Sequence, residues 1–473
     1  MTGVLPRSEE AADGEAPGAR SVTAVVGLLV LFELVSGILQ TGIGPLLPAI
    51  GDRFAVSDAT VNWVVSVQLL AAAVCVPAFG RLGDLHGHRR MLRIALVSVA
   101  AGSVIVAAAP SFPVLLAGRV LQGPLAALLP LEIALVRDRL PTDLARRAIA
   151  RLVGALTLGG LLGGVGLALA DKAFGDVRMA LWLAALLAVV CVPVSFVAVP
   201  ESARRADGRV DWPGVVLLSL SMIALLGGVG AAGRSGWGSA ATLLPVLAGL
   251  LLLAVWTVVE LRVREPLVDL RAMAGRRVAP VYLTSFVFGV VFFGSQAPNA
   301  TFFAADPDRA GYGFGMSAIA ISAALLPGVV SSVAGSALAA RLAGRLGYGR
   351  VLVCAYLLIA AAFAGFALGH GSLGVMIALY VVAGFGIGAA LSAMPTVIVE
   401  ASDPSRSGVA TALYNNVKTL GGALAGGVFG TLLASSGGSS APEGRYVLVW
   451  LLTGGCALIA TGAVLFASSA RVR

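Results

Sequence analysis

Residues 60–110 read TVNWVVSVQLLAAAVCVPAFGRLGDLHGHRRMLRIALVSVAAGSVIVAAAP, in which two apolar runs flank a short loop rich in basic residues. Each run is about 20 residues long, which matches the hydrocarbon thickness of a bilayer when the run forms a helix. The stretch therefore predicts two membrane-spanning helices, at 60–80 and 91–110, joined by a polar loop.

The same pattern extends over the whole chain. Apolar residues make up 58% of the 473 positions and charged residues only 12%, whereas about a quarter of the residues of a soluble chain are charged. We therefore expect an all-α membrane protein with about fourteen transmembrane helices. The predicted spans are 22–44, 60–80, 91–110, 113–136, 147–169, 178–199, 213–232, 241–261, 278–303, 316–340, 351–369, 374–398, 407–434 and 446–468.

The positions of the basic residues predict the orientation of these spans. If the N-terminus is cytoplasmic, 25 of the 33 Lys and Arg residues fall in cytoplasmic segments and six in external loops, while Arg119 and Lys418 lie inside spans. By the positive-inside rule both termini are then cytoplasmic, and residues 1–21 form a cytoplasmic tail. Basic loops at an anionic membrane surface also explain the net charge of +9, so we expect no nucleic-acid partner.

Several kinds of chemistry have no signature in the sequence. The four cysteines lie in separate apolar runs and the three histidines lack the spacing of metal ligands, so we expect no disulfide and no metal site. Neither a Walker-type phosphate loop nor a catalytic triad is recognisable. The sequence therefore predicts a protein that is not an enzyme, binds no cofactor and does not use ATP directly.

The chain carries a weak internal repeat. The stretch TLGGLLGG at 157–164 recurs as TLGGALAGG at 419–427, an offset of 262. The loop GRLGDLHGHRR at 80–90 has a degenerate echo, ARLAGRLGYGR, at 340–350, an offset of 260. These offsets pair spans 1–6 with spans 9–14, so we expect six-helix bundles at 22–199 and 276–473 and a two-helix insert at 200–275. Repeated halves around a central site are the usual plan of secondary transporters.

The loop at 80–90 carries a family resemblance. It matches the loop 2–3 motif of the major facilitator superfamily, and the whole chain resembles the fourteen-span drug:proton antiporter family within it. The resemblance implies the major facilitator fold and a conformational latch in which the loop's acid pairs across neighbouring helix ends, its glycines turn the chain and its arginines anchor it. The alternative is a plain positive-inside loop. The latch residues are Gly80, Asp84, Gly87, Arg89 and Arg90.

Spans 4 and 5 carry two further motifs. Arg119, followed by Gln122 and Gly123, is similar to the family's arginine motif. A charge inside a membrane costs ~3 kcal/mol, so Arg119 needs a partner or a wet cavity unless it reaches the outer membrane surface. Span 5 resembles the antiporter motif, although a glycine at 160 stands where the family usually has proline. Its glycines predict either that motif or a generic face for close helix packing. These glycines are Gly154, Gly159, Gly160, Gly163 and Gly164.

Charges inside the spans are the candidates for proton coupling. The family commonly has an acid nine residues before the position of Pro48, but Leu39 stands there and the acid of span 1 is Glu33. A carboxyl group at mid-membrane has a raised proton affinity unless it is paired. We therefore assign coupling to Glu33, to Glu132 in span 4, to Lys418 in span 13 and to the arginine of span 4. The alternatives are a structural Glu33 and a Glu132 at the polar end of its helix.

Polar side chains within the spans predict the substrate cavity. An apolar cavity with few polar groups suits bulky amphipathic compounds. The candidate cavity residues are Gln40, Gln68, Gln296, Asn299, Asn415 and Asn416.

These features predict a secondary active transporter in the plasma membrane. The expected activity is export of small, mostly apolar or amphipathic molecules by alternating access, coupled to proton antiport and driven by the proton gradient. One alternative is a dedicated exporter or importer of one metabolite, with a different coupling ion or none. Another is a proton-channel subunit of a respiratory complex, which the presence of only two lysines opposes. We expect a monomer whose partners are a small-molecule substrate and the lipid bilayer.

Overall fold

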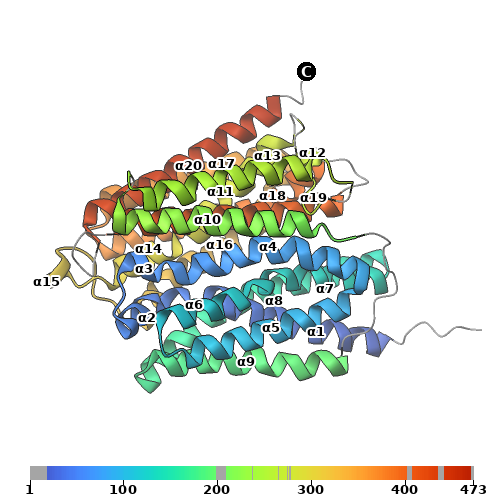
Figure 1. The fold of residues 1–473 in the computed structure, drawn as a ribbon, viewed down its shortest axis with the longest axis horizontal. Helices are drawn as coiled ribbons and strands as arrows, with labels where there is room; N and C mark the ends of the chain where they lie inside the picture. The colour runs from blue at the N-terminus through green and yellow to red at the C-terminus, as the bar shows by residue number, and fades with distance from the viewer. Residues whose placement is uncertain are drawn as a thin grey trace, which may run out of the picture.

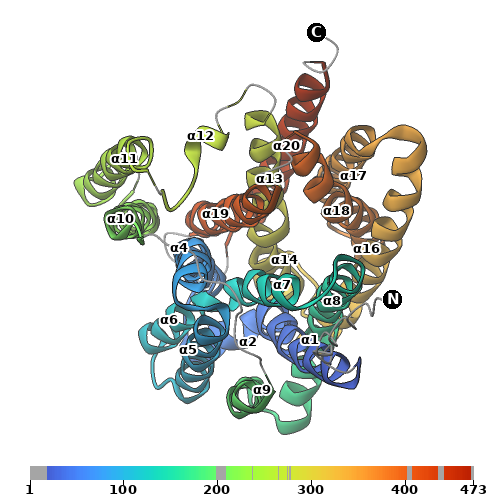
Figure 2. The same cartoon turned by 90° about the vertical axis from the view of Figure 1, so that its right-hand side faces the viewer.

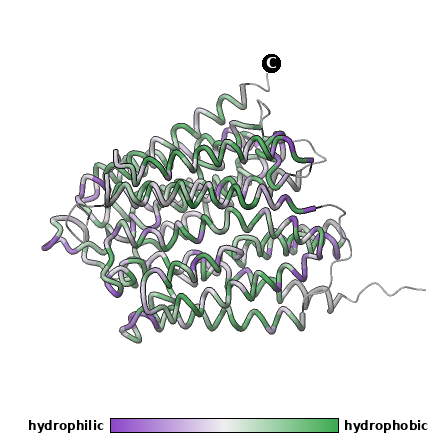
Figure 3. The backbone as a smooth tube through the Cα atoms, in the orientation of Figure 1, coloured by the Kyte–Doolittle hydropathy of each residue, from purple (hydrophilic) through white to green (hydrophobic). Residues whose placement is uncertain are grey.

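A computed structural model describes residues 19–198, 209–236, 238–264, 266–273, 275, 278–401, 407–434 and 441–469. These residues form long, roughly parallel helices joined by short turns (Figure 1). Apolar residues fill the length of the bundle and polar residues gather at its two ends (Figure 3). Helix α1 begins and helix α20 ends at the same end of the bundle, which we call the terminal end; the other is the distal end. The predicted tail at 1–21 lies outside the described residues except for 19–21.

The first half of the chain forms one group of helices (Figure 2). Its elements are α1 (Ala19–Thr41), η1 (Gly44–Leu46), α2 (Leu47–Phe54), α3 (Asp58–Val61), α4 (Trp63–His86), α5 (His88–Ala108), α6 (Phe112–Leu121), η2 (Gly123–Ala127), α7 (Leu128–Arg139), α8 (Thr142–Phe174) and α9 (Val177–Ala198).

The second half forms another group, and two helices lie to one side of both (Figure 2). The side helices are α10 (Trp212–Ser235) and α11 (Ala240–Glu260), followed by the short α12 (Leu270–Met273). The second group contains α13 (Ala279–Gly289), the π-helical turn η3 (Val290–Gly294), α14 (Gln296–Ala304), α15 (Pro307–Ala310), α16 (Ala318–Leu346), α17 (Tyr348–Gly369), α18 (Leu373–Ala401), α19 (Ser407–Leu433) and α20 (Glu443–Ser469).

Within the described part of the chain, thirteen segments are long and apolar enough to cross a membrane. The remaining predicted span, at 407–434, corresponds to α19, a 27-residue helix that also carries Asn415, Asn416 and Lys418. The predicted all-α membrane fold with about fourteen spans is therefore confirmed.

Three predicted spans are interrupted helices. Span 1 continues beyond its predicted end at 44 through η1 and α2, and span 4 is divided into α6, η2 and α7. Both interruptions fall at a Gly-Pro pair, Gly44-Pro45 and Gly123-Pro124, because proline removes a backbone donor and disfavours helical geometry in the residue before it. Span 9 passes through η3 between α13 and α14.

Equivalent glycines shape the two halves. The turn between α4 and α5 needs Gly87 at φ +98°, and the turn between α16 and α17 needs Gly347 at φ +81°, a region that side chains disfavour. A side chain at Gly37 on α1 would overlap the backbone of α8, and one at Gly289 on α13 would overlap the backbone of α19. The α1–α8 contact of the first half therefore has a counterpart, α13–α19, in the second.

The side helices contact both groups. Helix α10 packs on α11 and also contacts α4 and α19. The Thr431 hydroxyl of α19 donates a hydrogen bond of 2.8 Å to the carbonyl of Val229 on α10. A Cβ on Gly230 of α10 would lie 2.6 Å from the ring of Trp63 on α4, so the surfaces fit closely.

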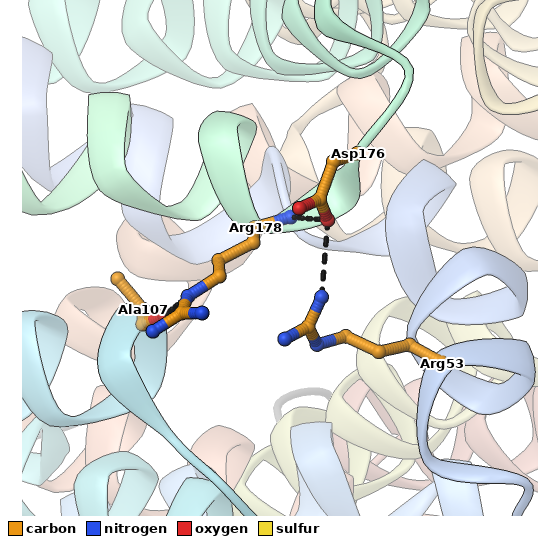
Figure 4. Close-up of polar contacts among 4 residues, drawn as sticks. All are labelled: Arg53, Ala107, Asp176 and Arg178. Carbon is orange, nitrogen blue, oxygen red and sulfur yellow. Dashed lines mark hydrogen bonds and ion pairs between the residues drawn. The ribbon is translucent and has the colours of Figure 1, made fainter.

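Charged residues brace the distal end of the first half (Figure 4). Asp176, just before α9, accepts a bond of 3.1 Å from Arg53 of α2 and one of 2.9 Å from the backbone amide of Arg178. The Arg178 guanidinium donates to the carbonyl of Ala107 on α5 at 3.3 Å. These contacts join the distal ends of three predicted spans.

Candidate functional site

Arg119 is buried inside the first half and surrounded by neutral acceptors. Its side chain is 1% exposed, so it does not reach the membrane surface. It donates to the Val64 carbonyl at 2.8 Å, to Gln122 Oε1 at 2.6 Å and to Gln68 Oε1. Gln122 in turn donates to the Ser103 hydroxyl at 2.8 Å. Gln68 therefore accepts a hydrogen bond from Arg119. Sequence analysis did not predict that Ser103 belongs to this network, although a hydroxyl group in the middle of span 3 is visible in the sequence.

A small cavity adjoins this arginine. Its volume is about 20 Å³, which is room for roughly one water molecule. Arg119, Gln122 and Ser103 supply its polar wall, and Leu39 of α1 supplies part of its apolar wall. Leu39 is the position where the resembling family commonly has an acid. A carboxylate at this position would line the same cavity as the Arg119 guanidinium. In this chain the guanidinium instead donates hydrogen bonds to neutral acceptors.

Two carboxyl groups lie beside each other on α1 and α7. Glu33 and Glu132 are both 0% exposed, and each carboxyl group is within interaction range of the other. Within the described part of the chain, none of the four carboxyl oxygens has a partner at ordinary hydrogen-bond distance. Two buried carboxylates side by side repel and lose their hydration, so this pair is suited to hold a proton. The interruption of span 4 places Glu132 in α7, while Arg119 remains in α6.

Lys418 of α19 is half-buried and lies apart from these acids. Its ammonium group sits 5.2 Å from the centre of the Tyr414 ring, one turn away on the same helix. Such cation–π contacts stabilise a charge by about 0.5–2 kcal/mol. Among the neighbouring amides, Asn416 is buried with an unpartnered Oδ1, whereas Asn415 is half-buried.

Three further cavity candidates have different surroundings. The Asn299 amide accepts a bond of 2.9 Å from Trp450 and donates one of 3.2 Å to Tyr380, so it is fully engaged inside the second half. Gln40 donates to Ser36 of its own helix at 3.0 Å. Gln296 faces the other half, since a Cβ on Gly44 would lie 3.9 Å from its Oε1. The six candidates thus come from four helices, α1, α4, α14 and α19, and differ in their hydrogen-bond partners.

The glycines of span 5 divide into two groups. A Cβ at Gly159, Gly160 or Gly163 would collide with α1, whereas one at Gly154 or Gly164 would meet nothing within 4 Å. The close packing face is therefore formed by the first group only. Gly160 has a specific role, because its carbonyl accepts a 2.9 Å bond from the hydroxyl of Thr41 on α1.

The loop between α4 and α5 pairs locally. Asp84 lies on the last turn of α4, and its carboxylate is 3.2 Å from Nε2 of His88 at the start of α5. Gly83 allows this turn to pack, since a Cβ there would lie 2.9 Å from a methyl group of Leu131 on α7. Gly80 has open space around it, Arg89 is half-buried and Arg90 is exposed.

Hydrogen bonds connect the two halves in the distal part of the bundle. The Asp58 carboxylate of α3 accepts bonds from the Tyr446 hydroxyl of α20 at 2.9 Å and from the amide of Ala441 at 3.3 Å. The Asn62 amide donates to the carbonyl of Gly426 at 2.6 Å. The Ser322 hydroxyl of α16 donates to the carbonyl of Gly164 on α8 at 2.7 Å, which gives this glycine a backbone role. Sequence analysis missed these partners, because residues this far apart carry no local signal of contact.

The sequence profile of the Major Facilitator Superfamily matches residues 29–426 and 303–472. The chain belongs to the Major Facilitator Superfamily. Its curated relatives include the tetracenomycin C resistance and export protein of Streptomyces glaucescens, 30% identical over 84% of this chain and 73% of the relative. The multidrug efflux pump LfrA of Mycolicibacterium smegmatis is 28% identical over 87% of this chain and 80% of the pump.

Solved structures agree with this membership in fold. A POT family peptide transporter has a TM-score of 0.68 at 15% identity, covering 95% of this chain and 97% of that one. The nucleoside transporter NupG has a TM-score of 0.66 at 15% identity, covering 94% and 99%. The superfamily consists of transporters, so the chain is a multi-pass membrane transporter for small molecules and not an enzyme.

Proposed function

We propose that this transporter exports small, mostly apolar or amphipathic molecules from the cytoplasm in exchange for protons. Two curated relatives are named for export or efflux, one of a single antibiotic and one of many drugs. The terminal end lies in the cytoplasm in this proposal, because 25 of the 33 basic residues fall in the segments that the sequence predicts to be cytoplasmic. The transporter works as a monomer in the plasma membrane.

The observation that carries the coupling proposal is the pair Glu33 and Glu132. Both side chains are fully buried, each lies within interaction range of the other, and none of their oxygens has a hydrogen-bond partner among the described residues. Burying one negative charge here is costly and burying two is far more so. The pair therefore takes up a proton when the site closes and releases it when water enters. Protonation of the pair is then tied to the conformation of α1 and α7.

Alternating access in this proposal is a movement of the halves at 22–199 and 276–473 against each other, with the insert at 200–275 alongside. The bonds of Asp58 to Tyr446 and Ala441 hold the distal end together. They must break when that end opens, and the latch loop at 80–90 closes the terminal end in that state.

Proteoliposomes test the coupling directly. Purified protein is reconstituted, a pH gradient is imposed, and accumulation of an amphipathic fluorescent dye is followed. We expect Glu33→Gln and Glu132→Gln each to lower gradient-driven accumulation by more than about tenfold, because a neutral amide cannot carry the proton. Glu260→Gln is the matched control, since Glu260 is equally buried but lies in the insert, where it accepts a bond from Val268 at 3.3 Å. Unchanged gradient-driven transport in both variants would contradict the coupling proposal.

A second candidate is a carrier dedicated to one metabolite, with another ion or none. It is favoured by the relative that is named for tetracenomycin C alone. A susceptibility panel in a host without other pumps separates the two: resistance to many unrelated compounds supports broad efflux, and resistance to one or none supports the dedicated carrier. Replacing the pH gradient by a sodium gradient in the same vesicles identifies the ion.

A further inference from the structure

A basic pocket lies at the terminal end of the first half, apart from the interface between the halves. It is formed where the end of α4, the start of α5 and the end of α9 meet, and its volume is about 570 Å³. Its polar wall consists of His86, Arg89, Arg90 and Arg93. No acidic residue is among the described residues that line it. The acid of the loop, Asp84, instead contacts Nε2 of His88 at 3.2 Å.

Arg93 fixes one wall of this pocket. Its guanidinium donates two bonds of 3.3 Å to the carbonyl of Ser195 and one of 3.2 Å to the carbonyl of Phe196. These carbonyls belong to the last turn of α9, where backbone acceptors have no partner within the helix. The guanidinium also lies 4.4 Å from the centre of the Phe196 ring. A positive group is thus held in place before any ligand arrives, which lowers the entropy cost of binding.

The other wall is apolar and open to the bilayer. Ile94 and Phe196 line the pocket and are 43% and 56% exposed. One turn further along α5, Val97 is 48% exposed, and two turns back along α9, Val189 is 41% exposed. Helical spacing puts Val97 on the face of Ile94 and Val189 on the face of Phe196. An apolar track therefore runs from the basic pocket into the hydrocarbon region along the paired helices α5 and α9.

We propose that this pocket binds the phosphate headgroup of an anionic phospholipid, with the acyl chains lying along α5 and α9. Guanidinium groups bind phosphate oxygens through paired, charge-assisted hydrogen bonds. A basic pocket between spans at the membrane surface suits an anionic headgroup. The apolar track favours a lipid over a free phosphate ion, because a phosphate ion has no apolar part that could pack against it. Because Arg89 and Arg90 belong to the loop at 80–90, the bound lipid also stabilises the present arrangement of that loop.

Native mass spectrometry of the purified protein tests this proposal. The protein is titrated with phosphatidylglycerol, with phosphatidylethanolamine and, separately, with inorganic phosphate as a competitor. We expect phosphatidylglycerol to remain bound at activation energies that strip phosphatidylethanolamine. The Arg90→Gln and Arg93→Gln double variant should lose at least about tenfold in phosphatidylglycerol affinity, because it removes two guanidinium groups that can donate charge-assisted hydrogen bonds to the phosphate. Thermal unfolding with each lipid gives an independent readout of the same difference.

The repeat provides the matched control. Arg350 stands at the position of the second half that corresponds to Arg90, it is equally exposed, and it lies outside the pocket. Arg350→Gln should keep wild-type lipid affinity. Arg90→Gln alone guards against misfolding of the double variant, because its exposed side chain can be changed without disturbing the Arg93 contacts. Equal retention of the two lipids, equal losses in the Arg90 and Arg350 variants, or full displacement by inorganic phosphate would each overturn the assignment.

Discussion

Replacing Gly163 by alanine should separate α1 from α8 and impair the transporter. A Cβ at this position would lie 2.6 Å from Ile38 Cα and 2.8 Å from the Ile38 carbonyl oxygen, whereas ordinary contact begins at 3.4 Å. Both atoms belong to the backbone, so no side-chain rotation relieves the collision. The helices must move apart by at least about 0.8 Å, and overpacking of this kind costs about 1–3 kcal/mol.

Gly164→Ala is the control for this variant. It adds the same methyl group to the next residue of the same helix, where nothing lies within 4 Å. Alanine favours helix by about 1 kcal/mol over glycine, so the control should be as stable as the wild type or slightly more so. Thermal unfolding in detergent and dye transport in vesicles measure both variants. If Gly163→Ala unfolds and transports like Gly164→Ala, the argument that close backbone contact holds α1 to α8 is refuted.

Three further outcomes are expected. Leu39→Glu adds a carboxylate to the cavity that Arg119 lines, where it can pair with the guanidinium. The variant should therefore fold, and the pH dependence of its dye transport should be shifted. A pH profile identical to that of the wild type would show that the carboxylate and the guanidinium do not interact. Tyr446→Phe removes the 2.9 Å bond to Asp58 and should raise the labelling rate of a cysteine placed at the distal end severalfold, because the open state gains population; unchanged labelling speaks against this contact as a gate. Gly87→Ala forces a side chain into φ +98° and should lower the free energy of unfolding by about 1–3 kcal/mol, with an unchanged melting curve as the contrary result.

The fold could be predicted from the sequence because membrane-spanning helices are recognised by the length and apolar composition of their segments. The spans and the loop at 80–90 are local features of the sequence, so no knowledge of the packing was needed to predict them. The interruptions of spans 1 and 4 were signalled by Gly44-Pro45 and Gly123-Pro124, but the surrounding apolar run concealed them. Periodicity locates an apolar segment well and says little about where its axis bends.

Partners across helices were beyond the reach of the sequence. Glu33 and Glu132 were each recognised as buried acids, yet their adjacency depends on how α1 packs against α7. Gln68 was predicted to line a cavity, and its hydrogen bond from Arg119 could not be predicted from the sequence. The difference between Gly163 and Gly164 likewise depends on which side of α8 faces α1. The residue type predicts which interactions a side chain can form, but the packing of the helices determines which residues it contacts.

The Asp58 contact also bears on how the chain is assembled. Asp58 is among the first residues to emerge at the distal end, and Tyr446 follows it 388 positions later, in the last helix. During synthesis the Asp58 carboxylate therefore lacks this partner until α20 has been made. These contacts across the distal end can therefore form only after α20 has joined the bundle, and they connect α3 to a helix made several hundred residues later.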